Sequence, residues 1–453
     1  MMRAVTLKLK AFFTQGHERT LKAKKNVAIS FLLKGVSICI GFILIPMTIN
    51  YVNPVQYGIW LTLSSVISWF SFFDIGLGNG LKNKVAEANA LKDYKQARIY
   101  ISTTYTILTM ISSAVFILFY CLNHFLSWSR ILNAPGVNGD NLNHLALIVF
   151  GLFCVQFVVQ TINVILTAMH EPAKVSVMYV VGQICTIIII YILTKNTTGS
   201  LNYLVLVLGG MPVFVQILTS VIYFNTSYKT ISPSLRLVNF KYSRELLGLG
   251  GAFFIIQIGT LILFQTDNIL ITQLFGPDSV TTFNVSYKLF SMIIMFFSII
   301  ITPFWSAFTD AITKGDLEWI KATLARMKKY WLLLCVLTLV ILVGSPVIYK
   351  FWLKGKVSVA FPISIAMALY VMCYCWIMLQ SYFLNGIGKI RIQVYLYTIG
   401  AVINIPLGIL LGRLIGIPGV TYSNIIVLVI IGIVLAIQSK KILNSEASGI
   451  WNR

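Results

Sequence analysis

The sequence predicts an all-α polytopic membrane protein with about twelve transmembrane helices, and two observations carry this prediction. The chain of 453 residues is 58% hydrophobic and only 11% charged, with a mean hydropathy of +0.85. Soluble globular proteins carry about 25% charged residues, so a single core cannot take up this much apolar surface, and the excess is expected to face lipid. Apolar runs long enough to cross a hydrocarbon layer of about 30 Å as helices recur along the whole chain. The alternation typical of β-barrel strands is absent, which leaves helices as the spanning element.

Twelve apolar runs have the length of a membrane span. The first lacks the features of a signal peptide: its apolar run is too long, and no small-residue cleavage site follows it. We therefore interpret it as a retained span. The runs are residues 27–49, 58–80, 101–126, 144–168, 173–194, 203–225, 247–274, 281–308, 330–352, 359–385, 391–412 and 418–438.

The distribution of Lys and Arg predicts that both termini are cytoplasmic. With the N-terminus inside, 27 of the 35 basic residues fall in cytoplasmic segments, 6 fall outside, and 2 lie within spans. This asymmetry follows the positive-inside rule. The net charge of +22 is then explained by topology and by attraction to anionic lipid. No nucleic-acid partner is expected, because the basic residues are scattered over short loops.

Cysteine and histidine usage gives no sign of a metal site or a disulfide. The seven cysteines all lie in apolar runs, no CxxC pair occurs, and the chain has four histidines. Metal ligands and disulfide frameworks have recognisable spacings that are missing here. We expect neither a metal nor a cofactor, and we interpret the cysteines as small packing residues.

A weak internal repeat divides the chain into two halves of six spans. Proline and charged residues recur with one constant offset of 223 residues and with matching charge signs. Halves with an even number of spans are related as parallel repeats about an axis along the membrane normal. The matched pairs are Pro54 and Pro277, Glu87 and Asp310, Asp93 and Asp316, and Arg98 and Lys321.

The repeat predicts a domain organisation of two six-helix bundles with cytoplasmic connections. In each half the second and third spans are joined by a segment with the pattern of an amphipathic helix, at residues 81–98 and 310–329, and such helices can lie on the inner leaflet. The predicted parts are a basic amphipathic N-terminus (1–26), an N-terminal bundle (27–225), a linker (226–246), a C-terminal bundle (247–438) and a tail (439–453).

Four ionisable residues fall inside the predicted spans. Lys34 and Asp74 lie toward the cytoplasmic side of the first and second spans, and Asp267 and Lys288 lie in the outer half of the seventh and eighth. A charge near a helix centre costs about 2.5–3.5 kcal/mol on insertion scales, so such residues usually face an interior cavity. One hypothesis is that Lys34 and Lys288 present positive charge to an anionic substrate. Asp74 and Asp267 would then hold these lysines or exchange a coupling cation.

Each of these charges also has a purely structural interpretation. Asp74 could cap a neighbouring helix or pair with Lys34, and Lys34 could extend to the inner membrane surface. Asp267 and Lys288 could form a fixed pair that joins the seventh and eighth spans. Amide side chains within the spans either contact sugars or bridge helices; they include Gln160, Asn163, Gln257, Gln265, Asn268, Asn284 and Asn404.

The stretch FFDIGLGNGLKNKVAEANALKDYKQARIYIST (residues 72–103) contains the most distinctive pattern. Its glycines follow a membrane helix rather than a strand, so a phosphate-binding nucleotide loop is not expected. The stretch resembles the second-span signature of the Wzx-type polysaccharide flippases, members of the multidrug/oligosaccharidyl-lipid/polysaccharide exporter (MOP) superfamily. The upstream NPVQYGIWLTLSSVISWFSF fits the same pattern. The resemblance is sharp over residues 45–105 and diffuse elsewhere.

The resemblance implies a MATE-like fold and a transporter of the bacterial inner membrane that works by alternating access. It implies a cargo of undecaprenyl-pyrophosphate-linked oligosaccharide repeat units for O-antigen, capsule or exopolysaccharide assembly. Cationic cavity residues in such families are thought to meet the pyrophosphate, a role that suits Lys34 and Lys288. A coupling ion, H⁺ or Na⁺, and contact with polysaccharide polymerase machinery and membrane lipids are further expectations.

Two other functions are considered. A cation-coupled multidrug exporter would share the fold, but it would favour acidic cavity residues, whereas the first span carries Lys34. A membrane glycosyltransferase or polymerase needs acids or bases in a sizeable outside loop. The longest such loop, residues 127–143, offers only Arg130 and Asp140, which gives general acid–base chemistry little to use. We therefore expect a transporter without catalytic residues.

Overall fold

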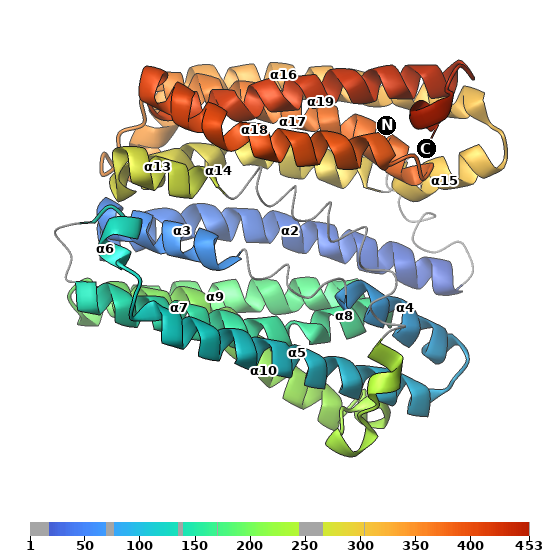
Figure 1. The fold of residues 1–453 in the computed structure, drawn as a ribbon, viewed down its shortest axis with the longest axis horizontal. Helices are drawn as coiled ribbons and strands as arrows, with labels where there is room; N and C mark the ends of the chain where they lie inside the picture. Colours follow the sequence, from blue (N-terminus) through green and yellow to red (C-terminus); the bar gives the residue numbers. More distant parts are fainter. Residues whose placement is uncertain are drawn as a thin grey trace, which may run out of the picture. The chain divides into compact units, whose positions relative to one another are not determined.

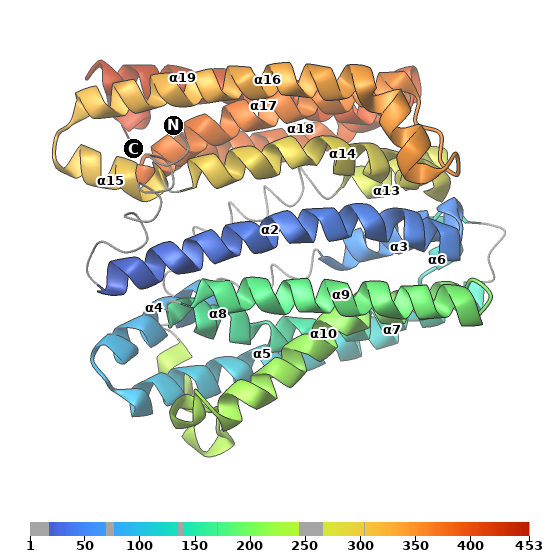
Figure 2. The same cartoon turned by 180° about the vertical axis from the view of Figure 1, so that it is seen from behind.

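The computed structural model describes residues 18–68, 77–134, 139–169, 171–243, 266–302 and 304–452, and these residues contain helices and no strand. Figures 1 and 2 show long helices joined by short turns. The α-helices are α2 (Glu18–Tyr51), α3 (Pro54–Ser68), α4 (Leu77–Ala90), α5 (Tyr94–Asn123), α6 (Trp128–Ile131), α7 (Gly139–Val159), α8 (Thr161–Ala168), α9 (Pro172–Asn196), α10 (Leu201–Asn225), α13 (Asp267–Phe275), α14 (Pro277–Ile301), α15 (Phe304–Thr313), α16 (Leu317–Leu353), α17 (Phe361–Gly386), α18 (Arg391–Ile415) and α19 (Ile417–Leu443).

The helical membrane fold is confirmed for ten of the twelve predicted spans. Ten helical segments of the described chain are long and apolar enough to cross a membrane, and each coincides with a predicted run. The second and seventh runs, 58–80 and 247–274, lie partly outside the described residues. The described part of the second run belongs to α3 and to the start of α4, and that of the seventh includes most of α13. The first helix begins earlier than predicted, because α2 includes residues 18–26 of the segment expected to precede it.

The chain divides into two compact units. The first comprises Met1–Tyr51, Phe70–Leu126 and Asn143–Phe253, and the second comprises Val52–Trp69, Ser127–Leu142 and Phe254–Arg453. The units group helices by contact, so α3 packs within the second unit although the repeat assigns it to the first half of the sequence. The bundle bounds 27–225 and 247–438 remain a prediction.

The described part of the predicted linker, residues 226–243, packs against α5 of the first unit. The guanidinium Nε of Arg98 donates to the carbonyl oxygen of Ser232 at 2.6 Å, and the hydroxyl of Ser102 accepts from the backbone N–H of Ser234. Ile231 is fully buried in a cluster that α4, α5 and α8 also supply. This part of the linker therefore belongs to the hydrophobic core that the first unit forms around α4, α5 and α8.

A small polar cluster fastens the start of the linker to the start of α9. The hydroxyl of Tyr228 donates to the carboxylate of Glu171, which also pairs with Lys174. The Lys174 ammonium lies 4.9 Å from the ring centre of Tyr223 and 5.3 Å from that of Tyr228. Burial and the adjacent Glu171 carboxylate raise the pKa of Tyr228, so its hydroxyl remains a hydrogen-bond donor at neutral pH.

The same turn geometry occurs twice, 223 residues apart. Asp93 caps α5 by accepting from the backbone N–H of Gln96, and Asp316 caps α16 by accepting from that of Trp319. The residue before each cap has a positive φ, 59° at Lys92 and 74° at Gly315. Side-chain capping satisfies N–H groups that a helix start leaves free. Each segment predicted as one amphipathic helix is therefore broken by a turn, at 91–93 and at 314–316.

Helices α3 and α14 approach each other closely through repeat-related positions. A Cβ atom built on Gly58 would lie 1.7 Å from the carbonyl oxygen of Pro277. Reciprocally, the hydroxyl of Thr281 donates to the carbonyl oxygen of Pro54 at 2.6 Å. Position 281 corresponds to 58 and 277 to 54 at the 223-residue offset. The contact is therefore approximately two-fold symmetric.

The caps give the first testable prediction. Asp93→Ala and Asp316→Ala should each destabilise the protein by about 1 kcal/mol, because the capped N–H loses its acceptor. Thermal unfolding in detergent, with amide hydrogen exchange over residues 94–97 and 317–320, measures the effect. Asp93→Asn and Asp316→Asn are the controls, since asparagine also caps. Equal losses in the Ala and Asn variants would contradict the capping role.

The close contact of α3 and α14 gives the second prediction. Gly58→Ala should destabilise the protein by about 1–3 kcal/mol, the range for an overfilled packing site, because the new methyl group meets backbone rather than a movable side chain. Gly35→Ala is the matched control: apart from its own stretch of α2, no atom of the described residues lies within 4 Å of a Cβ at Gly35. Thermal unfolding that ranks the two variants equally would show that α3 and α14 can separate without cost.

Candidate functional site

A polar cavity of about 210 Å³ lies within the second unit, between α13, α14, α17 and α19. These helices run together in this unit (Figures 1 and 2). Acidic, amide, hydroxyl and tyrosine side chains predominate in its wall, although the helices themselves are strongly apolar. The lining residues are Asp267, Asn268, Phe283, Asn284, Tyr287, Ile294, Met367, Tyr370, Tyr374, Thr421 and Asn424.

The carboxylate of Asp267 is the central charged group of this cavity. It sits at the first position of α13, and its side chain is 8% exposed. Oxygen Oδ2 accepts a hydrogen bond from the Asn424 amide at 2.7 Å, whereas Oδ1 has no hydrogen-bond partner among the described residues. The Oδ1 atom of Asn424 and the hydroxyl of Thr421 are likewise buried without a described partner. Three unused oxygen atoms therefore belong to one cavity.

A chain of amide hydrogen bonds joins this cavity to α3. The Asn284 amide donates to the Asn268 carbonyl oxygen Oδ1 at 2.7 Å, and the Asn268 amide donates to the hydroxyl of Ser65. One turn along α3, the hydroxyls of Thr62 and Thr272 are hydrogen-bonded at 2.6 Å. Such bonds within a membrane contribute about 0.6 kcal/mol each. They hold α3, α13 and α14 in register.

Tyrosine rings form another part of the wall. Tyr287 and Tyr370 meet edge to face with ring centres 6.3 Å apart, and Tyr370 stacks with Tyr374 at 5.9 Å. Tyr370 is 7% exposed, whereas Tyr287 is 38% exposed. Aromatic faces of this kind can pack against the apolar face of a sugar ring or against a cation.

This donor set suits a proton or a hard cation better than a transition metal. Carboxylate, amide and hydroxyl oxygens are the ligands that hard cations prefer. No group of three or more His, Cys, Asp or Glu that could hold a metal ion occurs within the described part of the chain. A buried carboxylate oxygen without a partner is costly, and a proton or a bound cation would relieve that cost.

The structure brings one of the four predicted site residues into this cavity. Asp267 lines it, but Lys288 is a half-buried residue of α14 that is not among the lining residues. No ion pair joins Asp267 to Lys288, since the carboxylate bonds to Asn424 instead. Lys34 is exposed on α2 of the first unit, and Asp74 lies outside the described residues.

Several cavity residues could not be identified as a group from the sequence. Asn268 and Asn284 stand out in the sequence as amides within predicted spans, but Thr421 and Asn424 lie more than 130 residues farther along the chain. Tyr370 and Tyr374 are spaced by four, which places them on one helix face, and this spacing was an available signal. Their proximity to Asp267 depends on how α13, α17 and α19 pack.

Comparison with known proteins identifies relatives among sugar-polymer exporters. The family described as "Polysaccharide biosynthesis protein" matches residues 23–308, and the MatE family matches residues 253–410. The chain is 21% identical over 362 residues to a Yersinia pseudotuberculosis protein named "Putative O-antigen export protein", covering 79% of this chain and 81% of that protein. It is 24% identical over 302 residues to a Salmonella typhi "Putative O-antigen transporter", covering 65% and 66%.

Solved structures of similar fold are transporters. An inward-facing multidrug resistance MATE family transporter of the MOP superfamily aligns with a TM-score of 0.69 at 15% identity, covering 90% of this chain and 98% of that one. An outward-facing MATE structure aligns with a TM-score of 0.62 at 14% identity, covering 96% and 98%. These likenesses confirm the MATE-like fold.

The family match spans more than half of the chain, and the helices, relatives and fold agree with it. The relatives are named as transporters rather than as enzymes. The chain therefore belongs to the polysaccharide biosynthesis protein family, as a Wzx-type, multi-pass transporter of the MOP superfamily in the bacterial inner membrane.

Proposed function

We propose that this transporter moves undecaprenyl-pyrophosphate-linked oligosaccharide repeat units from the inner to the outer leaflet by alternating access. The products would be O-antigen, capsule or exopolysaccharide. The names of the relatives support a sugar-polymer cargo. A pyrophosphate and a hydrophilic glycan cannot cross hydrocarbon unaided, because unpaired polar and charged groups there are very costly.

The observation that carries the proposal is the polar, tyrosine-lined cavity among apolar helices. Its amides and its Thr421 hydroxyl can exchange hydrogen bonds with sugar hydroxyls, and the ring faces of Tyr287 and Tyr370 can pack on a sugar ring. An ionisable side chain within membrane helices commonly marks a substrate or ion pathway, and Asp267 is such a residue in this wall. The amides of Asn268 and Asn284 already bridge helices. The unpaired oxygen atoms of Asp267, Asn424 and Thr421 are therefore the groups available to bind cargo or an ion.

We assign the charged residues three roles within this proposal. Lys34 and Lys288 would meet the pyrophosphate in different conformations of the transporter. Asp267, with the free oxygen atoms of Asn424 and Thr421, would take up and release a coupling H⁺ or Na⁺. Asp74 would be a charge partner for the lysines. Polysaccharide polymerase machinery is the expected receiver of the translocated cargo.

A cation-coupled multidrug exporter is the second candidate function. The match of the MatE family to residues 253–410 favours it, as does the acid in the cavity wall, since a carboxylate and tyrosines can bind an organic cation. The polysaccharide family matches the longer part of the chain. The two functions predict cargoes of opposite charge. They also predict different phenotypes when the gene is deleted from its host.

Deletion of the gene in its host should trap complete lipid-linked repeat units on the cytoplasmic leaflet and abolish surface polysaccharide. Extraction of undecaprenyl-linked glycans, with leaflet-specific labelling, measures this. Normal surface glycan with increased sensitivity to cationic drugs would favour the exporter. Short glycans already on the outer face would indicate a later-acting enzyme instead.

Lys34→Ala and Lys288→Ala should each reduce transport about 10-fold or more, because a hydrogen bond to a charged phosphate contributes about 1.5–3 kcal/mol. Lys356→Ala, an exposed lysine in the loop after α16, is the control and should transport normally. Complementation of the deletion strain, normalised to protein in the membrane, is the measurement. Full transport by both variants would remove the lysines from the mechanism.

Asp267→Asn should abolish the stimulation of transport by a proton or sodium gradient, because the substituted amide neither ionises nor carries a charge for a cation. Cargo exchange without a gradient should persist. Proteoliposomes with imposed pH or Na⁺ gradients provide the measurement. Asp278→Asn is the control, since Asp278 is exposed in the first turn of α14. Unchanged gradient stimulation in Asp267→Asn would exclude this carboxylate as the coupling group.

A further inference from the structure

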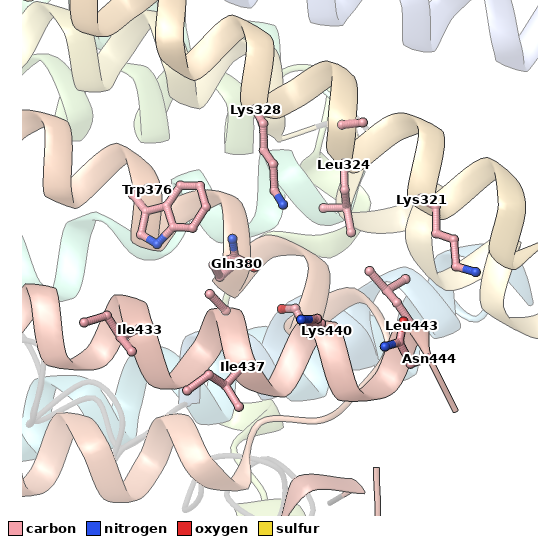
Figure 3. A pocket seen from close by; sticks show the side chains of 13 residues that line it. Lys321, Leu324, Lys328, Trp376, Gln380, Ile433, Ile437, Lys440, Leu443 and Asn444 are labelled. Atoms are coloured by element: carbon pink, nitrogen blue, oxygen red, sulfur yellow. The ribbon is translucent and has the colours of Figure 1, made fainter. Parts of the chain in front are cut away.

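A second cavity, of about 540 Å³, lies in the second unit between α16, α17 and α19, near the end of α16 that begins at Leu317 and the end of α19 at Leu443 (Figure 3). It shares no lining residue with the cavity around Asp267. Lysines from two helices, a tryptophan and a buried amide line it. No acidic residue is among the lining residues.

The charge of this cavity is positive. Lys321 and Lys328 of α16 and Lys440 of α19 line it. Glu318 pairs with Lys321 at 3.6 Å, so Lys321 is partly compensated. The Lys328 ammonium lies 5.9 Å from the ring centre of Trp376, and Figure 3 shows this side chain extending from α16 toward Gln380 of α17. Lys328 and Lys440 are therefore the cations without a carboxylate partner among the described residues.

Two buried polar side chains belong to the wall of this cavity. Gln380 is 3% exposed, and its amide is directed into the cavity (Figure 3). The hydroxyl of Ser439 is buried and has no hydrogen-bond partner among the described residues. Buried polar groups are normally hydrogen-bonded. An oxygen-rich anionic ligand would supply acceptors for the Gln380 N–H groups, the Ser439 hydroxyl and both lysines.

An apolar groove of about 300 Å³ continues from this cavity along the same three helices. It shares Trp376 and Ile433 with the cationic cavity and is otherwise lined by Trp331, Met372, Cys373, Leu428 and Val429. The indole N–H of Trp331 donates to the carbonyl oxygen of Met372, and that of Trp376 to Gly432. With both donors used within the protein, the indole rings present apolar surface to the groove.

The sequence positions place the groove deeper along the helices than the lysines. Leu428 precedes Lys440 by twelve residues of α19, which is about 18 Å along a helix. Trp331 lies one turn beyond Lys328 in α16, farther from the helix start. The cavity lined by lysines near the helix ends thus continues into a groove whose apolar walls can accommodate a hydrocarbon chain. A soluble phosphate would use only the first part, whereas a lipid phosphate would use both.

We propose that this composite site binds an anionic phospholipid of the bilayer. Its phosphate is held by Lys328, Lys440 and Gln380, and an acyl chain lies in the groove beside Trp331 and Trp376. Basic pockets between transmembrane helices are suited to anionic head groups. The site is independent of the proposed cargo, since it shares no residue with the cavity around Asp267. It gives the transporter a means to respond to lipid composition.

The test uses the purified full chain in nanodiscs without cargo. Phosphatidylglycerol and phosphatidylcholine with identical brominated chains are the probes, and quenching of tryptophan fluorescence reports occupancy. Phosphatidylglycerol should bind preferentially. The double variant Lys328→Gln/Lys440→Gln should weaken its binding about 30-fold, because each lysine contributes about 1 kcal/mol to the attraction of an anionic lipid. Gln380→Leu, which keeps the net charge, should also weaken it. The matched control, Lys329→Gln/Lys441→Gln, removes the neighbouring lysines and should bind normally.

Several outcomes would overturn the proposal. Equal binding of phosphatidylcholine, or equal losses in the two double variants, would mean that the cavity does not recognise the phosphate. Binding of glycerol phosphate as strong as that of the lipid would indicate a soluble ligand. Stronger binding of undecaprenyl pyrophosphate would assign the site to the carrier lipid. Thermal unfolding of each variant verifies that the compared proteins are folded.

Discussion

The close packing of α3 against α14 is the contact on which the polar site of this protein depends. Helices in lipid have no hydrophobic drive to associate, so they need small residues that allow near approach and hydrogen bonds that reward it. Gly58 allows the backbone of Pro277 to come within reach, and Thr281 bonds to Pro54 in return. At this separation, Ser65 on α3 can reach Asn268 on α13. A larger side chain at position 58 would remove that alignment.

The cavity around Asp267 follows from this alignment. The amides of Asn268 and Asn284 are largely used in bridging helices, and the Asn424 amide holds one oxygen of the carboxylate. The groups left over are the second carboxylate oxygen, the Asn424 carbonyl oxygen and the Thr421 hydroxyl. A membrane protein keeps such unsatisfied groups at a cost. Their concentration in one cavity, rather than their individual chemistry, makes this site the candidate for cargo or coupling ion.

The second unit contains two sites of opposite character. The Asp267 cavity is acidic and lined by tyrosines, whereas the cavity between α16, α17 and α19 is cationic and opens onto an apolar groove. Helix α17 contributes to both: Tyr370 and Tyr374 line the first, and Trp376 and Gln380 line the second. Tyr374 and Trp376 are two residues apart, and residues at this spacing point to different sides of a helix. A lipid bound at the second cavity would therefore contact the helix that also forms the first.

The sequence by itself determined the apolar runs of ten spans and the repeated placement of Asp93 and Asp316, because these depend on local composition and spacing. The turns that these two residues cap fall within segments that the sequence pattern predicts as continuous helices. Apolar runs of fixed length become helices in a bilayer, and Asp93 and Asp316 start helices wherever their chain segments fold. Only the tertiary structure decided that Asn424 would hold Asp267, that Lys288 would not, and that Gln380 would face Lys328. These outcomes depend on the rotation and depth of helices far apart in the chain. A shift of one residue along a helix rotates a side chain by about 100°, and the sequence pattern of a mostly apolar helix does not encode which partner it will face.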